Sequence, residues 1–135
     1  MEETVIVIML KDSKTGFLEK ELGCYKITED ENLIYNTYAV EDGEKTKVFM
    51  KLTTDREVED WEFEAIYDYY DNETISPFVT SIEEDTECYN PTWCITFDFV
   101  SNIEEMEEKI GRILKLHKQE LQSVYEAIAD KRDEY

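Results

Sequence analysis

Apolar and polar residues follow a strand-like pattern through most of the first hundred positions of the chain. Residues 5–10 are apolar at every position, which is typical of a central strand buried on both faces. After a turn at residues 11–16, residues 17–28 alternate imperfectly, and the alternation changes parity at Gly23. A glycine at such a change predicts a β-bulge, because one extra residue moves the pattern from one face to the other.

Two further segments predict a β-hairpin. Residues 33–40 have the composition of a strand, and residues 47–53 alternate, so that their apolar side chains share one face. Between the two segments lies the sequence Glu-Asp-Gly-Glu at positions 41–44. The pair Asp-Gly favours a tight turn, because glycine adopts a positive φ without steric cost.

Three more strands are predicted between residues 61 and 99. Residues 61–69 alternate with a period of two, which favours a strand. The alternative is a helix, whose apolar side would consist of Val58, Trp61, Ala65, Ile66 and Tyr69. Residues 78–82 are predicted as a short strand, and residues 93–99, with clear alternation, as a longer one.

The hydrophobic period changes near Ser101, where a long helix is predicted. Apolar residues then recur at spacings of three and four. Ser101 with Glu104, or Asn102 with Glu105, forms a capping box at the start. A helix over residues 102–131 would be roughly 45 Å long at 1.5 Å per residue, which exceeds the width of a small sheet. We therefore expect the helix either to bend around the domain or to extend beyond it and contact a partner, such as a second copy.

These elements predict a single α+β domain. Residues 1–100 form an antiparallel meander of about six to seven strands, and residues 101–132 form one long C-terminal helix packed on it. The order of strands and final helix also matches the pleckstrin-homology type of barrel, whose last helix plugs an open end. This similarity concerns element order alone, and an open sheet accounts for the pattern equally well.

The charge of the chain restricts its partners. The formal net charge is −20, so nucleic acids and anionic membranes are repelled at long range, and neither is expected as a partner. A hydrophobic fraction of 41% and an aromatic fraction of 13% indicate a folded domain rather than an acidic disordered tail.

Targeting signals and cysteine use predict a cytoplasmic protein. The acidic start at residues 1–3 does not resemble a signal peptide, and the apolar run at residues 5–10 is too short to cross a bilayer. Cys24, Cys88 and Cys94 are odd in number, and their spacings match no redox pair or zinc knuckle. We expect reduced thiols in a reducing compartment.

Candidate catalytic and metal-binding residues are few. His117 is the only histidine and lies on the apolar side of the predicted helix, so we interpret it as a structural residue, with a catalytic base as the alternative. One His and three scattered Cys are a poor set of zinc ligands, and the acidic segment 68–73 does not fit an EF-hand loop. The four glycines are isolated, unlike those of a phosphate-binding loop. We therefore expect no metal, no cofactor and no assignable catalytic residue.

One segment combines negative charge with aromatic side chains. Residues 55–100 contain 14 acidic residues with Arg56 as the only base, and 10 of the 17 aromatic residues. If the strands at 61–69 and 93–99 turn their aromatic side chains to the core, the acidic residues share the opposite face. Tyr70 would add a ring that attracts cations, and Arg56 a salt bridge or a ligand anchor. The predicted binding face consists of Glu62, Glu64, Asp68, Tyr70, Asp98 and Arg56. The alternative is an ordinary solvated surface.

Three segments support a family resemblance. They are KLTTDREVEDWEFEAIYDYYD at residues 51–71, YNPTW at residues 89–93, and the acidic C-terminal helix. Together they resemble a small uncharacterised protein family of bacteria of the low-GC Gram-positive type, over nearly the whole chain. The resemblance implies a bacterial cytosolic protein, and it implies no activity or functional residue.

Three functions are consistent with these features. The first is a non-enzymatic binding or scaffolding module, whose acidic, Tyr-bearing face binds a basic protein segment and whose long helix supports a homodimer. The second is a small enzyme that uses carboxylates or His117 on a neutral or cationic substrate. The third is an acidic mimic of nucleic acid, against which the six bases of residues 101–135 count. We favour the first.

Overall fold

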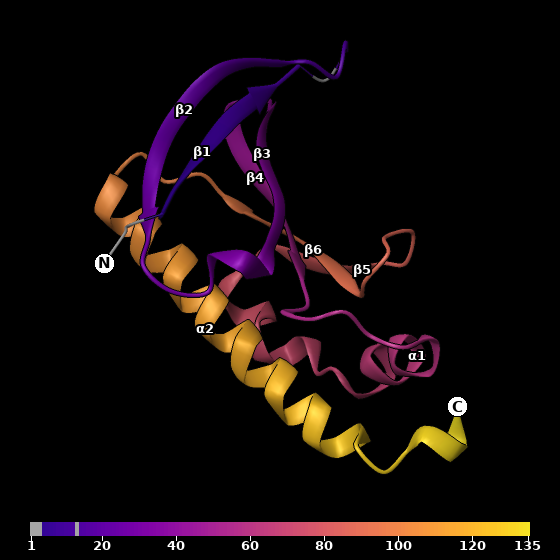
Figure 1. The fold of residues 1–135 in the computed structure, drawn as a ribbon. Coiled ribbons are helices and arrows are strands. Elements are labelled where there is room, and N and C mark those ends of the chain that lie inside the picture. Colours follow the sequence, from indigo (N-terminus) through magenta and orange to yellow (C-terminus); the bar gives the residue numbers. More distant parts are fainter. Residues whose placement is uncertain (1–3, 13) are drawn as a thin grey trace.

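The computed structural model describes residues 4–12 and 14–135 and contains one sheet with a long helix across one face (Figure 1). Residues 1–3 and Ser13, which falls in the predicted turn at 11–16, lie outside the described residues. The strands are β1 (Thr4–Lys11), β2 (Leu18–Ile27), β3 (Ile34–Asp42), β4 (Lys45–Thr53), β5 (Ser81–Asp85) and β6 (Thr92–Asp98). The helices are α1 (Asp60–Tyr69) and α2 (Ile103–Ile128), and the short 3-10 turns are η1 (Glu31–Leu33), η2 (Asn72–Thr74), η3 (Ser76–Phe78) and η4 (Arg132–Glu134).

The sheet has six strands in the order β2-β1-β3-β4-β6-β5. The predicted α+β class with a long C-terminal helix is confirmed, and all pairs are antiparallel except β1 with β3. That parallel pair departs from the predicted meander. The hairpin of β1 and β2 ends where β1 began, so β3, which starts there, runs in the same direction as β1. The sheet is open, with β2 and β5 as its edges, which decides against the barrel.

The turn predicted at Gly43 and the β-bulge predicted at Gly23 are both present. A two-residue turn joins β3 to β4, and Gly43 adopts a φ of +66° there. The register of β1 with β2 shifts between Ile8 and Met9, which pair with Gly23 and Glu21. The bulge at Gly23 also makes room for an aromatic ring, since a Cβ at position 23 would lie 2.6 Å from the Tyr25 hydroxyl oxygen.

The replacement Gly23→Ala is expected to lower the free energy of unfolding by about 1–3 kcal/mol, because the Tyr25 ring is buried and must move. Gly111→Ala is the matched control. No neighbouring atom lies within 4 Å of a Cβ at this helical position, so alanine should stabilise α2 by up to about 1 kcal/mol. Urea unfolding followed by circular dichroism measures both variants. Stabilisation of both would contradict the packing of Tyr25 over Gly23.

Strand β1 is covered on one face only, so the predicted burial on both faces is wrong for the chain by itself. Ile8 is fully buried, whereas Val5 and Val7 are 49% and 43% exposed. Alternation places Ile8 toward α2 and the two valines on the opposite face. The apolar residues of that second face have no cover within the described structure.

The segment at 61–69 is helical, so the predicted strand is wrong and the alternative helix is correct. Glu59 and Glu62 form a capping box: the Glu59 side chain accepts from the backbone N–H of Glu62, and the Glu59 N–H donates to Oε1 of Glu62 at 2.9 Å. Ala65 and Ile66 are fully buried, three and four positions after Glu62. The alternation of aromatic residues therefore does not correspond to two sheet faces.

The short strand also begins later than predicted. Phe78 belongs to η3, where Pro77 lies in the first turn, and β5 starts at Ser81. The fixed φ of proline suits the start of a helical turn, which accounts for the difference.

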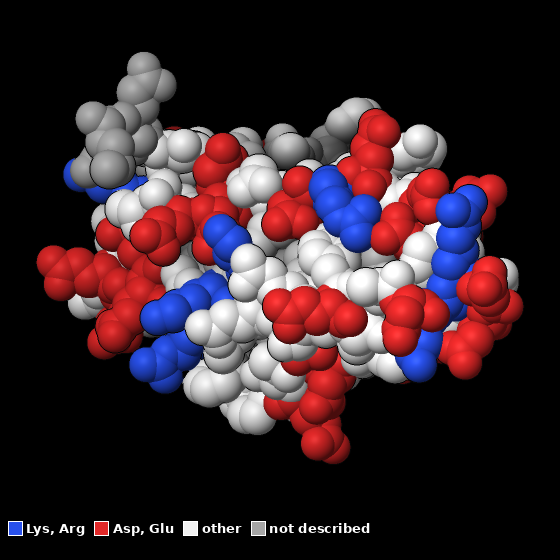
Figure 2. Space-filling model, turned by 60° about the horizontal axis from the view of Figure 1, so that its bottom comes forward, with Lys and Arg blue, Asp and Glu red and all other residues white. Residues whose placement is uncertain are grey.

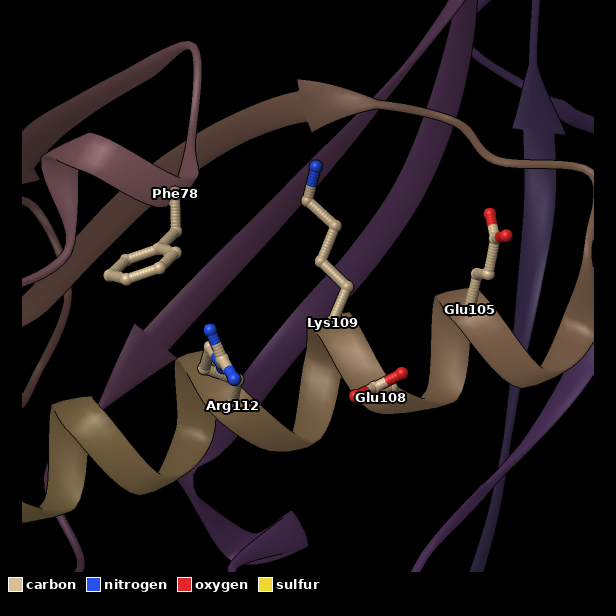
Figure 3. Close-up of a pocket in the computed structure, with 5 residues that line it drawn as sticks. All are labelled: Phe78, Glu105, Glu108, Lys109 and Arg112. Carbon is tan, nitrogen blue, oxygen red and sulfur yellow. The ribbon is translucent and has the colours of Figure 1, made fainter.

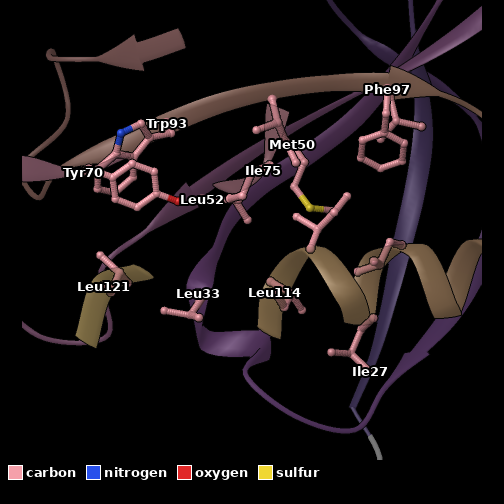
Figure 4. Close-up of a cluster of buried hydrophobic side chains, with 14 of the residues drawn as sticks. Ile27, Leu33, Met50, Leu52, Tyr70, Ile75, Trp93, Phe97, Leu114 and Leu121 are labelled. Carbon is pink, nitrogen blue, oxygen red and sulfur yellow. The ribbon is translucent and has the colours of Figure 1, made fainter. Parts of the chain in front are cut away.

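Helix α2 buries its apolar side from Met106 to Ile128, whereas Ile103 in its first turn is exposed. Asn102 caps the helix by accepting from the N–H of Glu105 at 3.0 Å, as one of the two predicted capping pairs requires. The N-terminal half packs on the sheet, and the C-terminal half packs on α1, so that Leu121, Val124 and Ile128 are also buried. Figure 4 shows the resulting core. Helix α1 thus covers the C-terminal half of the apolar side of α2.

Candidate functional site

His117 is sealed within the core. Its side chain is fully buried; Nε2 lies 2.8 Å from the carbonyl oxygen of Thr53, and Nδ1 lies 2.8 Å from the hydroxyl oxygen of Tyr70. A carbonyl oxygen only accepts, so Nε2 carries the proton and Nδ1 accepts from Tyr70. Burial lowers the pKa of His117 to about 4. The neutral ring is therefore held in the core by two hydrogen bonds, on the apolar side of α2.

Arg56 forms a salt bridge within its own segment. Its guanidinium makes two hydrogen bonds to the Glu62 carboxylate, at 2.8 and 3.3 Å, and lies 4.3 Å from the centroid of the Tyr125 ring. The hydrogen bond from Arg56 lowers the pKa of Glu62. Arg56 therefore holds the loop before α1 against α2, and its charge is already matched.

The structure does not bring the predicted face together. Tyr70 lies in the core, and Glu62 is 9% exposed beside Arg56. Glu64 and Asp68 are exposed on α1, and Asp98 is exposed at the end of β6. The prediction of this face assumed that residues 61–69 form a strand, in which every second side chain points to the same side. In a helix successive residues turn by about 100°, so Glu62 points inward while Glu64 and Asp68 point to solvent.

Helix α1 and the β5–β6 hairpin lie at one end of the molecule (Figure 1). Both elements carry exposed carboxylates. Tyr67 of α1 joins these elements: its hydroxyl donates to the carbonyl oxygen of Asp85 at 2.9 Å and accepts from the N–H of Thr92 at 2.8 Å. We define the acidic pole as the exposed acids of α1 and of this hairpin, which are Asp60, Glu64, Asp68, Glu83, Glu84 and Glu87.

The carboxylates of the acidic pole have no ion-pair partner among the described residues. Within residues 4–12 and 14–135, none of the six carboxylates of the pole forms an ion pair with a Lys or Arg. Lys51, which approaches the hairpin, binds Asp85 at 2.8 Å instead. Over the face shown in Figure 2, in contrast, basic side chains lie among the acidic ones.

Exposed aromatic rings accompany the acidic pole. Tyr69, at the end of α1, is 40% exposed, and Tyr89, in the β5–β6 turn, is 81% exposed. The faces of aromatic rings attract Lys and Arg side chains. Carboxylates and tyrosines together therefore form a surface with the chemistry to bind cations.

The binding face predicted from the sequence overlaps only partly with this site. The predicted face includes Glu64 and Asp68 and lacks Asp60, the β5–β6 acids and Tyr89. The useful signal was the charge of the whole segment 55–100, with 14 acids and one base. Alternation along a strand selected the wrong residues for this surface, because the segment at 61–69, predicted as a strand, is a helix.

A second surface feature is a hollow of about 410 Å³ between η3 and α2. Phe78, Glu105, Glu108, Lys109 and Arg112 line it (Figure 3). The Arg112 guanidinium lies 5.7 Å from the centroid of the Phe78 ring. Two bases and two acids give this lining no net charge, so it does not favour an ion of one sign.

The described residues form neither a metal-binding cluster nor a membrane-spanning helix. Among residues 4–12 and 14–135, no three His, Cys, Asp or Glu side chains lie close enough together to hold a metal ion. Within the same ranges, no helix is both long and apolar enough to cross a bilayer. Cys24, Cys88 and Cys94 are free thiols.

The fold and the site define a small α+β protein with an open sheet, a long C-terminal helix and an acidic surface at one end. The chain belongs to a family of unknown function, DUF6762, whose model matches residues 1–135. The predicted resemblance to a family without an assigned activity is thereby confirmed, and its bacterial origin remains a prediction. No curated protein and no solved structure matches the chain.

Proposed function

We propose that this protein is a non-enzymatic binding module whose acidic pole captures a basic segment of another protein. The observation that carries the proposal is that the six carboxylates of the pole form no ion pair with a described residue, although the chain contains 14 Lys and Arg residues. A segment rich in Lys and Arg would supply the missing charge. His117 supports a non-enzymatic role, because it is buried and neutral.

Electrostatics would govern both the rate and the salt dependence of this binding. The net charge of −20 attracts a basic segment at long range and raises the rate of encounter. Each exposed ion pair contributes only about 0–1 kcal/mol, so affinity must come from several pairs together with the rings of Tyr69 and Tyr89. Salt screens such contacts, and binding should weaken as ionic strength rises.

The cysteines and the net charge bear on where the module works and on what it binds. Three free thiols support a reducing compartment, and we place the protein in the cytoplasm. The same negative charge that attracts a basic segment supports the exclusion of nucleic acids and anionic membranes as partners.

The test is the binding of a fluorescent peptide of alternating Lys and Arg, followed by anisotropy at increasing salt concentration. The double variant Glu64→Lys with Glu84→Lys reverses one charge on each element of the pole. It is expected to weaken peptide binding about tenfold or more, since two attractive contacts become repulsive. Circular dichroism should be unchanged, because both side chains are exposed.

The matched control is Glu44→Lys with Glu108→Lys, which changes the net charge equally. Glu44 lies in the β3–β4 turn and Glu108 on the N-terminal half of α2, and both are exposed. Peptide affinity should change less than about twofold in this variant. Equal weakening in the two double variants would show that only total charge matters, and the acidic pole would then be no specific site.

A further inference from the structure

The sheet face opposite α2 is unusually apolar for a surface in water. Alternation with the buried residues places Val5, Val7 and Met9 of β1 on this face, together with Tyr38 of β3 and Phe49 of β4. The rings of Tyr38 and Phe49 stack with centroids 5.4 Å apart and an interplanar angle of 10°. An antiparallel sheet with one solvated face normally presents polar side chains there.

The apolar surface continues across the centre of the sheet. A hollow of about 630 Å³ lies beside the Tyr38–Phe49 pair and is lined by Val40, Phe49 and Thr96, with Thr80, Ser81 and the charged side chains of Glu41 and Lys47 around them. This face of the sheet is therefore not flat: the stacked rings of Tyr38 and Phe49 lie next to a depression.

The charges of this face nearly balance, in contrast to those of the whole chain. On the described residues of the strands other than β2, alternation directs four lysines and three acids outward: Lys11, Lys45, Lys47, Lys51, Glu83 (which also belongs to the acidic pole), Asp85 and Asp98. The chain as a whole carries −20. Two copies would repel each other strongly through most surfaces, and a nearly neutral face is where they could approach.

We infer that the open sheet face is the interface between two copies of this chain. Residues 5–10 have the composition of a strand buried on both faces, and the chain alone covers one of them. A second copy would cover the other by packing sheet against sheet. Six strands spaced about 4.8 Å apart and about seven residues long make a face of roughly 29 by 23 Å, comparable to the area of roughly 800 Å² per partner in a standard interface.

Charge placement fits a two-fold arrangement. The lysines lie on β1 and β4, and the acids lie on β6 and the edge strand β5. Lys51 already pairs with Asp85 of its own chain. A two-fold axis through the face sets the same patch of both copies against itself, so other lysines of one copy can lie opposite acids of the other. The stacked rings of Tyr38 and Phe49 then lie near the middle, where aromatic residues contribute most to affinity.

Size-exclusion chromatography with light scattering tests this interface. At chain concentrations from about 5 to 200 µM, which bracket micromolar dissociation constants, the wild-type protein is expected at twice the chain mass of 16.1 kDa. Phe49→Lys should reduce the mass to that of one chain. The dimer should persist at high salt, because its interface is mainly apolar, whereas binding of a basic peptide at the acidic pole should not.

Two further variants make the result decisive. Val7→Lys places a charge at a position that is 43% exposed, so it should disturb folding little. This variant should also be monomeric. Phe78→Lys, at an exposed position on the helix side of the sheet, should remain dimeric. A wild-type mass of one chain throughout, a dimer that survives Val7→Lys, or a dimer lost in Phe78→Lys would each overturn the inference.

Discussion

Trp93→Ala is expected to lower the free energy of unfolding by about 3–5 kcal/mol, since it leaves a large cavity in a closed core. Trp93 is fully buried. Its ring stacks on Tyr70 with centroids 4.3 Å apart and meets Tyr67 and His117 edge to face at 5.4 and 5.2 Å. One replacement therefore weakens the contact of β6 with both helices. Small domains are stable by about 5–15 kcal/mol in total, so much of the protein should be unfolded in mild urea.

Tyr89→Ala is the control for this loss. Tyr89 lies in the turn that precedes β6 and is 81% exposed, so its removal should change the free energy of unfolding by less than about 0.5 kcal/mol. Urea unfolding followed by circular dichroism compares the two variants. A cost below about 1 kcal/mol for Trp93→Ala would mean that the sheet and the two helices do not share one core.

Acidification from pH 7 to pH 5 is expected to lower the free energy of unfolding by about 2 kcal/mol through His117 alone. The folded pKa is about 4, and the unfolded value is about 6.5. Between these values the unfolded chain binds a proton that the folded chain does not. Stability is therefore complete above the unfolded pKa, falls as the pH drops below it, and has lost about 3 kcal/mol once the pH reaches the folded pKa.

The variant His117→Gln isolates this effect. It should be less stable than the wild type at pH 7, because the Tyr70 hydroxyl and the Thr53 carbonyl lose their partner. Its stability should change much less between pH 7 and pH 5. The lowered pKa values of Glu62 and Asp85 act below this window, since their stabilisation is lost only as the pH falls below their ordinary values. Equal slopes in the two proteins would contradict the buried, neutral histidine.

Patterns that depend on neighbouring residues were predicted correctly from the sequence. The apolar spacing of α2 and the cap at Asn102 follow from helix geometry, and the turn at Gly43 follows from the steric freedom of glycine at positive φ. The bulge at Gly23 is also local, since it appears as a change of parity within one strand. The family resemblance added no functional residue to these predictions.

The conformation of residues 61–69 required more than the local pattern. The segment satisfies the strand period through its aromatic residues and the helix period through Ala65 and Ile66. The helix is selected because it buries Ala65 and Ile66 while Glu62 closes the cap and binds Arg56. The same helix covers the end of α2, so the composition of the acidic pole depends on a contact between segments far apart in the chain.

Residues close together in the chain account for the α+β class, the long helix, the turn at Gly43, the bulge at Gly23 and the excess of acid in residues 55–100, so all of these could be predicted. The parallel pairing of β1 with β3, the burial of Tyr70 beside His117 and the exposure of Val5 and Val7 could not, because they arise from contacts between distant segments. These features depend on which distant surfaces meet. The free energy of such contacts belongs to the pair of surfaces, and the residues of either segment alone do not specify it.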